Sequence, residues 1–143
     1  MPLPVPEPGL VVSYSYLWHS EDEQDQEEGL KDRPCAIILV AEDAAGETLV
    51  TVVPITHSAP ARDAVEIALA VKRRLGVDEA RSWTVVSEVN RFVWPGPDLR
   101  PVTRGDPERF DYGFLPPSLF RQIRDRFMAA AAAQRLKVVP RSE

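Results

Sequence analysis

Residues 33–58 read RPCAIILVAEDAAGETLVTVVPITHS, and this stretch decides the fold. Two runs rich in Val, Ile and Thr flank a polar turn that contains Gly46, a pattern typical of a β-hairpin. Apolar β-branched residues occupy adjacent positions in both runs, as at Val52 and Val53. Because neighbouring strand residues point to opposite faces, the pattern predicts strands that are covered on both faces, as in a small closed barrel.

Polar side chains gather where this hairpin should end. Pro54 has no amide donor, so we expect the sheet ladder to loosen there, and Thr56, His57 and Ser58 follow it. A hairpin in register about its turn would bring Arg33 to the same end of the sheet. The sequence therefore predicts one rim that holds a cation, two hydroxyls and an imidazole.

Length and composition bound the class of protein. The 143 residues fit a single domain, 1–143, with one modest core. We find no run of 18 apolar residues and no secretory signal, so we expect a cytoplasmic protein that does not enter a membrane. Residues 1–8 should form an extended proline-rich arm and residues 137–143 a frayed tail. The single Cys35 lies in an apolar run and should be buried as a free thiol.

The negative charge is concentrated in one segment. The net charge is −5, but residues 20–28 contain six acids and no base, and the rest of the chain without them carries +1. Such a segment cannot bury apolar area, and its like charges repel one another. We therefore expect residues 20–29 to form a mobile acidic loop.

The rest of the chain predicts further strands and two helices. Apolar residues at helical spacing indicate a helix over 63–75, ending at Gly76. A second helix should begin at Ser118, a plausible N-cap, and include the alanine run 129–133. Residues typical of β structure predict strands over 10–18, 83–94 and 99–102.

The order of these motifs resembles the MazF/PemK family, whose members share a fold with CcdB. The motifs are Gly9-Leu-Val-Val, Arg33-Pro and Pro54-Ile-Thr, and the likeness extends over nearly the whole chain. The late strand of that family matches residues 82–90, and its closing helix matches residues 115–133.

The resemblance implies a mostly β fold. We expect an SH3-like small β-barrel of about five to seven strands, with a short mid-chain helix and a C-terminal helix. It also implies a short strand over 64–67 followed by a helix over 68–75, in place of the single helix that periodicity predicts.

The same resemblance implies a toxin-like endoribonuclease of a toxin–antitoxin pair. Such enzymes cleave single-stranded RNA without a metal ion by attack of the substrate's own 2′-hydroxyl, act as homodimers and bind an antitoxin protein. Arg33 and Thr56 match the family's catalytic arginine and threonine. A guanidinium suits this role because it holds a phosphate through two parallel hydrogen bonds. Strand alternation would place His57 on the opposite face from Thr56.

Five further residues are candidates for acid–base work or substrate binding. His57 is of the type that exchanges protons near neutral pH, and Ser58 is a possible phosphate contact. Arg91 would bind a substrate phosphate, and Trp94 would stack on a base or cap the core. His19 lies beside the acidic segment. The spacing of His and Cys matches no metal site, so we expect neither a metal nor another cofactor.

The acidic segment is the clearest departure from the family pattern. Six negative charges beside an RNA groove would repel a polyanion, most strongly at low salt. Two alternatives therefore stay open: a catalytically silent barrel that serves as a protein-binding module, and a topoisomerase poison like CcdB.

Overall fold

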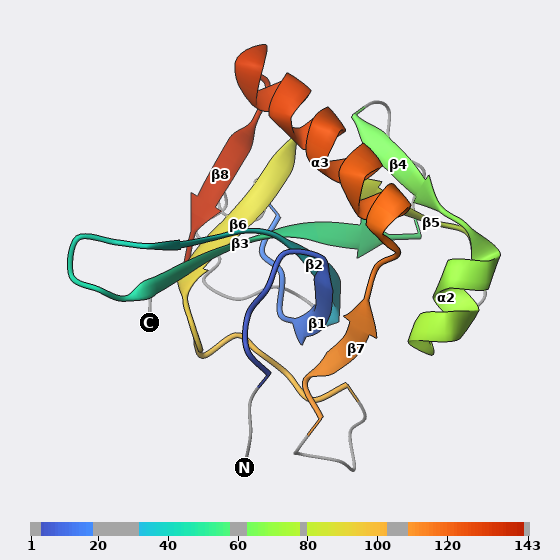
Figure 1. Ribbon diagram of the computed structural model, residues 1–143, viewed down its shortest axis with the longest axis horizontal. Helices are drawn as coiled ribbons and strands as arrows, with labels where there is room; N and C mark the ends of the chain where they lie inside the picture. Colours follow the sequence, from blue (N-terminus) through green and yellow to red (C-terminus); the bar gives the residue numbers. More distant parts are fainter. Residues whose placement is uncertain (1–3, 19–31, 58–62, 78–79, 103–108, 142–143) are drawn as a thin grey trace.

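The computed structural model describes residues 4–18, 32–57, 63–77, 80–102 and 109–141 (Figure 1). This part of the chain forms a mostly β structure, a curled sheet with two helices, and so confirms the small β-barrel with helices. Its strands number eight, more than the five to seven expected. They are β1 (Leu10–Tyr14), β2 (Arg33–Glu42), β3 (Thr48–Thr56), β4 (Ala64–Ile67), β5 (Ser82–Val85), β6 (Glu88–Val93), β7 (Asp111–Phe114) and β8 (Lys137–Pro140).

Strand β3 is the centre of the sheet. One of its edges pairs with β2 from Thr48 onward, and β2 continues the sheet to β1 and β7. The other edge is divided, because β6 pairs with its first half and β5 with its last two residues. Strand β4 extends the sheet beyond β5, while β8 runs parallel to β6. The predicted β2–β3 hairpin is confirmed, with its turn at Gly46.

Two apolar clusters lie on opposite faces of the β2–β3 hairpin. Ile38 and Val53 belong to the first cluster, together with residues of both helices. Ile37 and Val52 belong to the second, which also holds Tyr14 and other aromatic side chains. All four aliphatic residues are at most 1% exposed. The adjacent apolar positions in the sequence thus reflect burial on both faces, as predicted.

The two helices differ in length, with 7 residues in one and 16 in the other. Helix α2 (Leu69–Leu75) follows β4 directly, so the strand-then-helix order implied by the resemblance is confirmed there. Gly76 ends it in the left-handed conformation, with φ of 78°. Helix α3 (Pro117–Ala132) begins with proline, and its N-cap is Pro116 without a side-chain cap, so the prediction of Ser118 as N-cap was wrong. Neither helix combines the length and the apolar character needed to cross a bilayer.

Several predicted strand boundaries were wrong. The first strand stops at Tyr14, because Ser15 donates its N–H to the carbonyl of Asp98 and the chain leaves the sheet while still buried. The predicted strand over 83–94 is divided into β5 and β6, which pair with different parts of β3. The predicted strand over 99–102 is reduced to one bridge between Leu99 and Tyr14.

Two strands at the C-terminal side were missed. Strand β7 contains Gly113 at φ of 102°, so local propensity gave no strand signal, and pairing with β1 forms it. The tail predicted to fray instead forms β8 over Lys137–Pro140, because the backbone of β6 offers it an edge. In the N-terminal arm, residues 4–7 belong to neither a helix nor a strand. The acidic loop predicted over 20–29 lies outside the described residues.

A buried polar network fastens the end of β8 to the body. Arg141 forms a 2.9 Å ion pair with Asp98, and both side chains are below 10% exposed. Its guanidinium also donates to the carbonyl of Ser15 at 2.8 Å and to the side-chain oxygen of Asn90 at 3.1 Å. Asn90 in turn bonds both backbone groups of Leu17. The network therefore connects β6 and β8 to the chain that follows β1.

Replacing Arg141 by Ala should destabilise the fold strongly. The substitution leaves the carboxylate of Asp98 buried without its cation, which costs about 3–5 kcal/mol in comparable sites. Urea unfolding followed by circular dichroism measures the change in the free energy of unfolding. Arg81→Ala is the control, because its ion pair with Glu66 is exposed and should matter little. Equal effects of the two substitutions would contradict the assignment.

The thiol of Cys35 should be inert in the folded protein. It is fully buried, and burial raises its pKa far above the ordinary range by disfavouring the thiolate, which is the reactive form. We expect no alkylation by iodoacetamide at pH 8 over hours, and rapid alkylation in denaturant. Mass spectrometry of the intact protein gives the readout, and fast labelling of the native chain would be evidence against this burial.

Candidate phosphate-binding site

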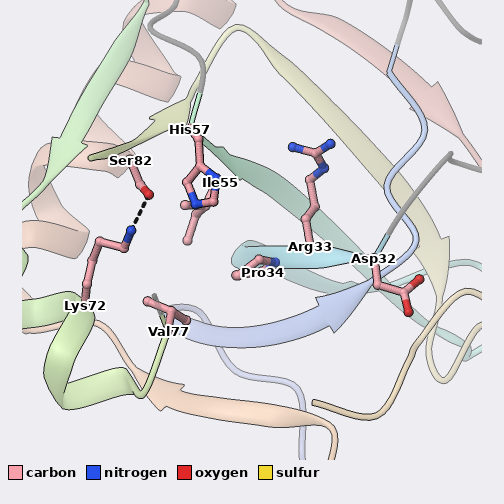
Figure 2. Close-up of a pocket in the computed structure, with 8 residues that line it drawn as sticks. All are labelled: Asp32, Arg33, Pro34, Ile55, His57, Lys72, Val77 and Ser82. Carbon is pink, nitrogen blue, oxygen red and sulfur yellow. Dashed lines mark hydrogen bonds between the residues drawn. The ribbon is translucent and has the colours of Figure 1, made fainter. Parts of the chain in front are cut away.

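A pocket of about 150 Å³ lies where β2 begins and β3 ends (Figure 2). Its walls come from both strands, from α2 and the turn that follows it, and from the start of β5. The lining residues are Asp32, Arg33, Pro34, Ile55, His57, Lys72, Val77 and Ser82. Two residues singled out in the sequence, Arg33 and His57, therefore both border this pocket.

The register of the hairpin explains why both residues lie at this pocket. Cys35 pairs with Pro54, so two more residues in each direction bring Arg33 opposite Thr56, and the side chains of two such residues lie on the same face of the sheet. His57 follows directly after the last residue of that strand and is exposed. The expectation that a cation and an imidazole share one end of the sheet agrees with this placement.

Arg33 is held by an aromatic ring. Its guanidinium carbon lies 5.1 Å from the centre of the Trp18 ring, within the range of a cation–π contact. The Nε atom of Arg33 is buried and has no hydrogen-bond partner among the described residues. A buried donor without a partner costs free energy, and the cation–π contact with Trp18 is the interaction that the described residues give to this guanidinium.

Lys72 forms the opposite wall. It is only 2% exposed, although it belongs to α2 at the surface. Its Nζ donates to the carbonyl of Ala80 and, at 2.5 Å, to the hydroxyl of Ser82. These bonds fix the ammonium group at the pocket wall, as Figure 2 shows.

Thr56 lies on the other face of β3 from the pocket. Alternation along β3 groups it with Val52, whose side chain belongs to the second apolar cluster, while Ile55 lines the pocket. Thr56 is 8% exposed, pairs with Trp83 of β5, and does not line the pocket. The structure thus places His57 and Thr56 on opposite faces, as strand alternation predicts.

The other candidates lie elsewhere. Arg91 pairs with Thr51 in the middle of the sheet. Trp94 follows β6 at the far end of β3, about 26 Å along the strand from the pocket by the usual strand rise. Its ring stacks on Phe92 and packs against the second apolar cluster, the arrangement of a core-capping residue. Ser58 and His19 lie outside the described residues.

Three pocket features were missed in the sequence. Lys72 belongs to a basic triplet in the last turn of α2, where cations are favourable in any helix, so its residue type gives no signal of a pocket. Ser82 and Trp18 had no motif around them. Only tertiary contacts bring Lys72 to Ser82 and Trp18 to Arg33.

The pocket is suited to an anion. Lys72 lines the pocket with its ammonium group, whereas Figure 2 shows the guanidinium of Arg33 directed away from Lys72 and Ser82, and the Asp32 side chain directed away from the other lining residues. His57 adds a group that can donate or accept a proton. Among the described residues, no three His, Cys, Asp or Glu side chains gather as metal ligands would. The arrangement can bind a phosphate and exchange a proton beside it.

Replacing Lys72 by Met should loosen the pocket wall. The variant keeps an unbranched apolar stem but leaves the Ala80 carbonyl and the Ser82 hydroxyl without their charged partner. We expect a loss of about 1.5–3 kcal/mol in the free energy of unfolding, measured with urea. Arg73→Met is the control, because this neighbour on α2 is exposed. A loss no larger than that of the control would argue against the anchoring role.

Comparison with known proteins leaves the family open. The chain matches no protein-family model and no curated protein.

Proposed function

We propose that this chain is a metal-independent endoribonuclease that cleaves single-stranded RNA, the activity that the MazF/PemK resemblance implies. The observation that supports it best is that Arg33, which matches the arginine of that family, borders the same pocket as His57 and Lys72. A phosphodiester would supply the negative charge that these basic side chains favour.

The proposed reaction is an internal transesterification. The 2′-oxygen of the RNA attacks the adjacent phosphorus, and the bond from phosphorus to the 5′-oxygen breaks. The products are a 2′,3′-cyclic phosphate and a 5′-hydroxyl. One proton leaves the 2′-hydroxyl and one joins the departing 5′-oxygen, so the reaction needs groups that move protons and cations that stabilise the phosphorane.

The pocket residues suit these tasks differently. In this proposal Arg33, which borders the pocket, holds the non-bridging oxygens through its terminal guanidinium donors. His57 is exposed at the pocket, which suits it to proton transfer. Lys72 adds positive charge from a fixed position, because its Nζ is already bonded to the wall.

Thr56 has a supporting role in this proposal. The resemblance assigns catalysis to it, but its side chain is largely buried on the face away from the pocket. We assign proton transfer to His57 and give Thr56 the task of holding the end of β3 against β5.

The proposal includes a second copy of the chain and an antitoxin protein as partners. In the family that the chain resembles, the enzyme acts as a homodimer and is bound by an antitoxin protein. A purified chain must therefore be freed of bound protein before its activity is measured, for example by refolding from denaturant.

Arg33→Ala should abolish RNA cleavage. The test incubates the refolded chain with a long single-stranded RNA in EDTA and follows fragments on a denaturing gel. Loss of the phosphate-binding guanidinium should slow cleavage by about 10²-fold or more, while Arg33→Lys keeps part of the rate. Arg124→Ala on the exposed side of α3 is the control and should cleave normally. An inert wild-type chain would remove the enzymatic proposal.

The same assay separates the two candidate proton-transfer residues. His57→Gln should lower the rate by about 10²-fold or more, the usual contribution of a general acid or base. Thr56→Val keeps the shape of the side chain and should leave most of the rate. A larger loss of rate in Thr56→Val than in His57→Gln would instead assign the catalytic role to Thr56.

A further inference from the structure

The β2–β3 hairpin extends beyond the body of the protein (Figure 1). Strand β2 pairs with β1 only as far as Ala36, and one further bond joins the Gly9 amide to the Ile37 carbonyl. The N–H of Leu10 donates to the carbonyl of Glu7 and so closes a turn. Among the described residues, no hydrogen bond joins the arm before this turn to β2. Strand β2 itself continues to Glu42.

The outer edge of this extension has unused backbone groups. The carbonyl of Thr48 on β3 accepts from the N–H of Trp94, so the backbone groups of Thr48 point away from β2. Thr48 and Glu42 are opposite each other and therefore form a non-hydrogen-bonded pair, so the backbone groups of Glu42 point away from β3. Alternation gives the same direction to Val40, the partner of Val50. Within the described residues, no hydrogen bond satisfies the outward N–H and C=O groups of Val40 and Glu42.

The part of the hairpin beyond Arg33 carries only negative charge. Between Pro34 and His57 the sequence contains three acids, Glu42, Asp43 and Glu47, and no Lys or Arg. Glu42 and Glu47 are exposed and form no ion pair with another described residue. On the β2 edge, Leu39 adds an apolar surface and is 42% exposed.

We infer that the outer edge of β2 at Val40 and Glu42 accepts an added strand from an extended peptide of a partner protein that carries Lys or Arg beside apolar residues. The two residues offer two donors and two acceptors at the spacing of a sheet ladder. Basic side chains would pair with the acids of the hairpin, and apolar ones would cover Leu39. A second copy of the chain fits poorly, because its own edge carries the same three acids. RNA is disfavoured for the same reason.

Amide hydrogen exchange of the full chain, followed by NMR, tests the added strand. The probe is the capped peptide Lys-Val-Lys-Val-Lys-Val, compared with Glu-Val-Glu-Val-Glu-Val and with a lysine peptide whose internal amides are all N-methylated. In the free chain the amides of Val40 and Glu42 should exchange fast, and those of Leu39 and Ala41, which face β3, slowly. The lysine peptide alone should slow exchange at Val40 and Glu42.

Variants separate backbone pairing from charge. Val40→Pro removes an outward donor without removing a β2–β3 hydrogen bond, and should abolish binding of the lysine peptide. Glu42→Lys should weaken it several-fold at low salt, and less at high salt. Asp125→Lys makes the same change of charge on α3, where the side chain is exposed, and should bind normally.

Three results would overturn the inference. One is protection of Val40 and Glu42 in the free chain that grows with its concentration, which identifies a second copy as the occupant. Another is equal protection by the acidic and the basic peptide. The third is a lysine peptide that leaves both amides unprotected in the folded wild type. None of them bears on RNA cleavage, which depends on the pocket at the other end of β3.

Discussion

The structure depends on the sharing of one strand between two partners. The even-numbered residues of β3 direct their backbone groups to the side where β6 pairs with Val52 and β5 pairs with Thr56. Pro54 lies between them and has no N–H to leave unsatisfied at the change of partner. The residue between the β6 pairing and the β5 pairing is thus the one residue of β3 that has no backbone N–H to satisfy. On its other side β3 stays paired with β2, where Pro54 lies opposite Cys35. The pocket lies at the end of β3 beyond this change of partner.

The two ends of β3 have different chemistry. At one end, Arg33, Lys72 and the exposed His57 border a small pocket, and their positive charge favours an anion. At the other end, the hairpin carries acids and an unpaired backbone edge, which favours a basic strand. The buried ion pair of Arg141 and Asp98 fastens the C-terminal strand to the chain that follows β1 and so supports the frame between the two ends. Binding at one end does not require groups from the other.

Local patterns predicted the parts of the fold that local physics controls. Alternating and adjacent apolar residues indicated β2 and β3 and their burial on both faces, because side-chain direction along a strand has a fixed period. The same period predicted that His57 and Thr56 lie on opposite faces. The strand at Ala64–Ile67 needed the family resemblance, since its residues also fit a helix. Strands β7 and β8 were missed because only a partner edge stabilises them.

The sequence by itself determined the hairpin, the buried thiol of Cys35 and the nearness of Arg33 to His57, because a two-residue period and one turn specify all three. The tertiary structure decided that Lys72 and Ser82 complete the pocket, that Trp18 holds Arg33, and that Trp94 packs against the core. It also decided that Arg141 is an anchor of the fold. These contacts join residues that are distant in sequence, and no local pattern records which side chains the closing of the sheet brings together.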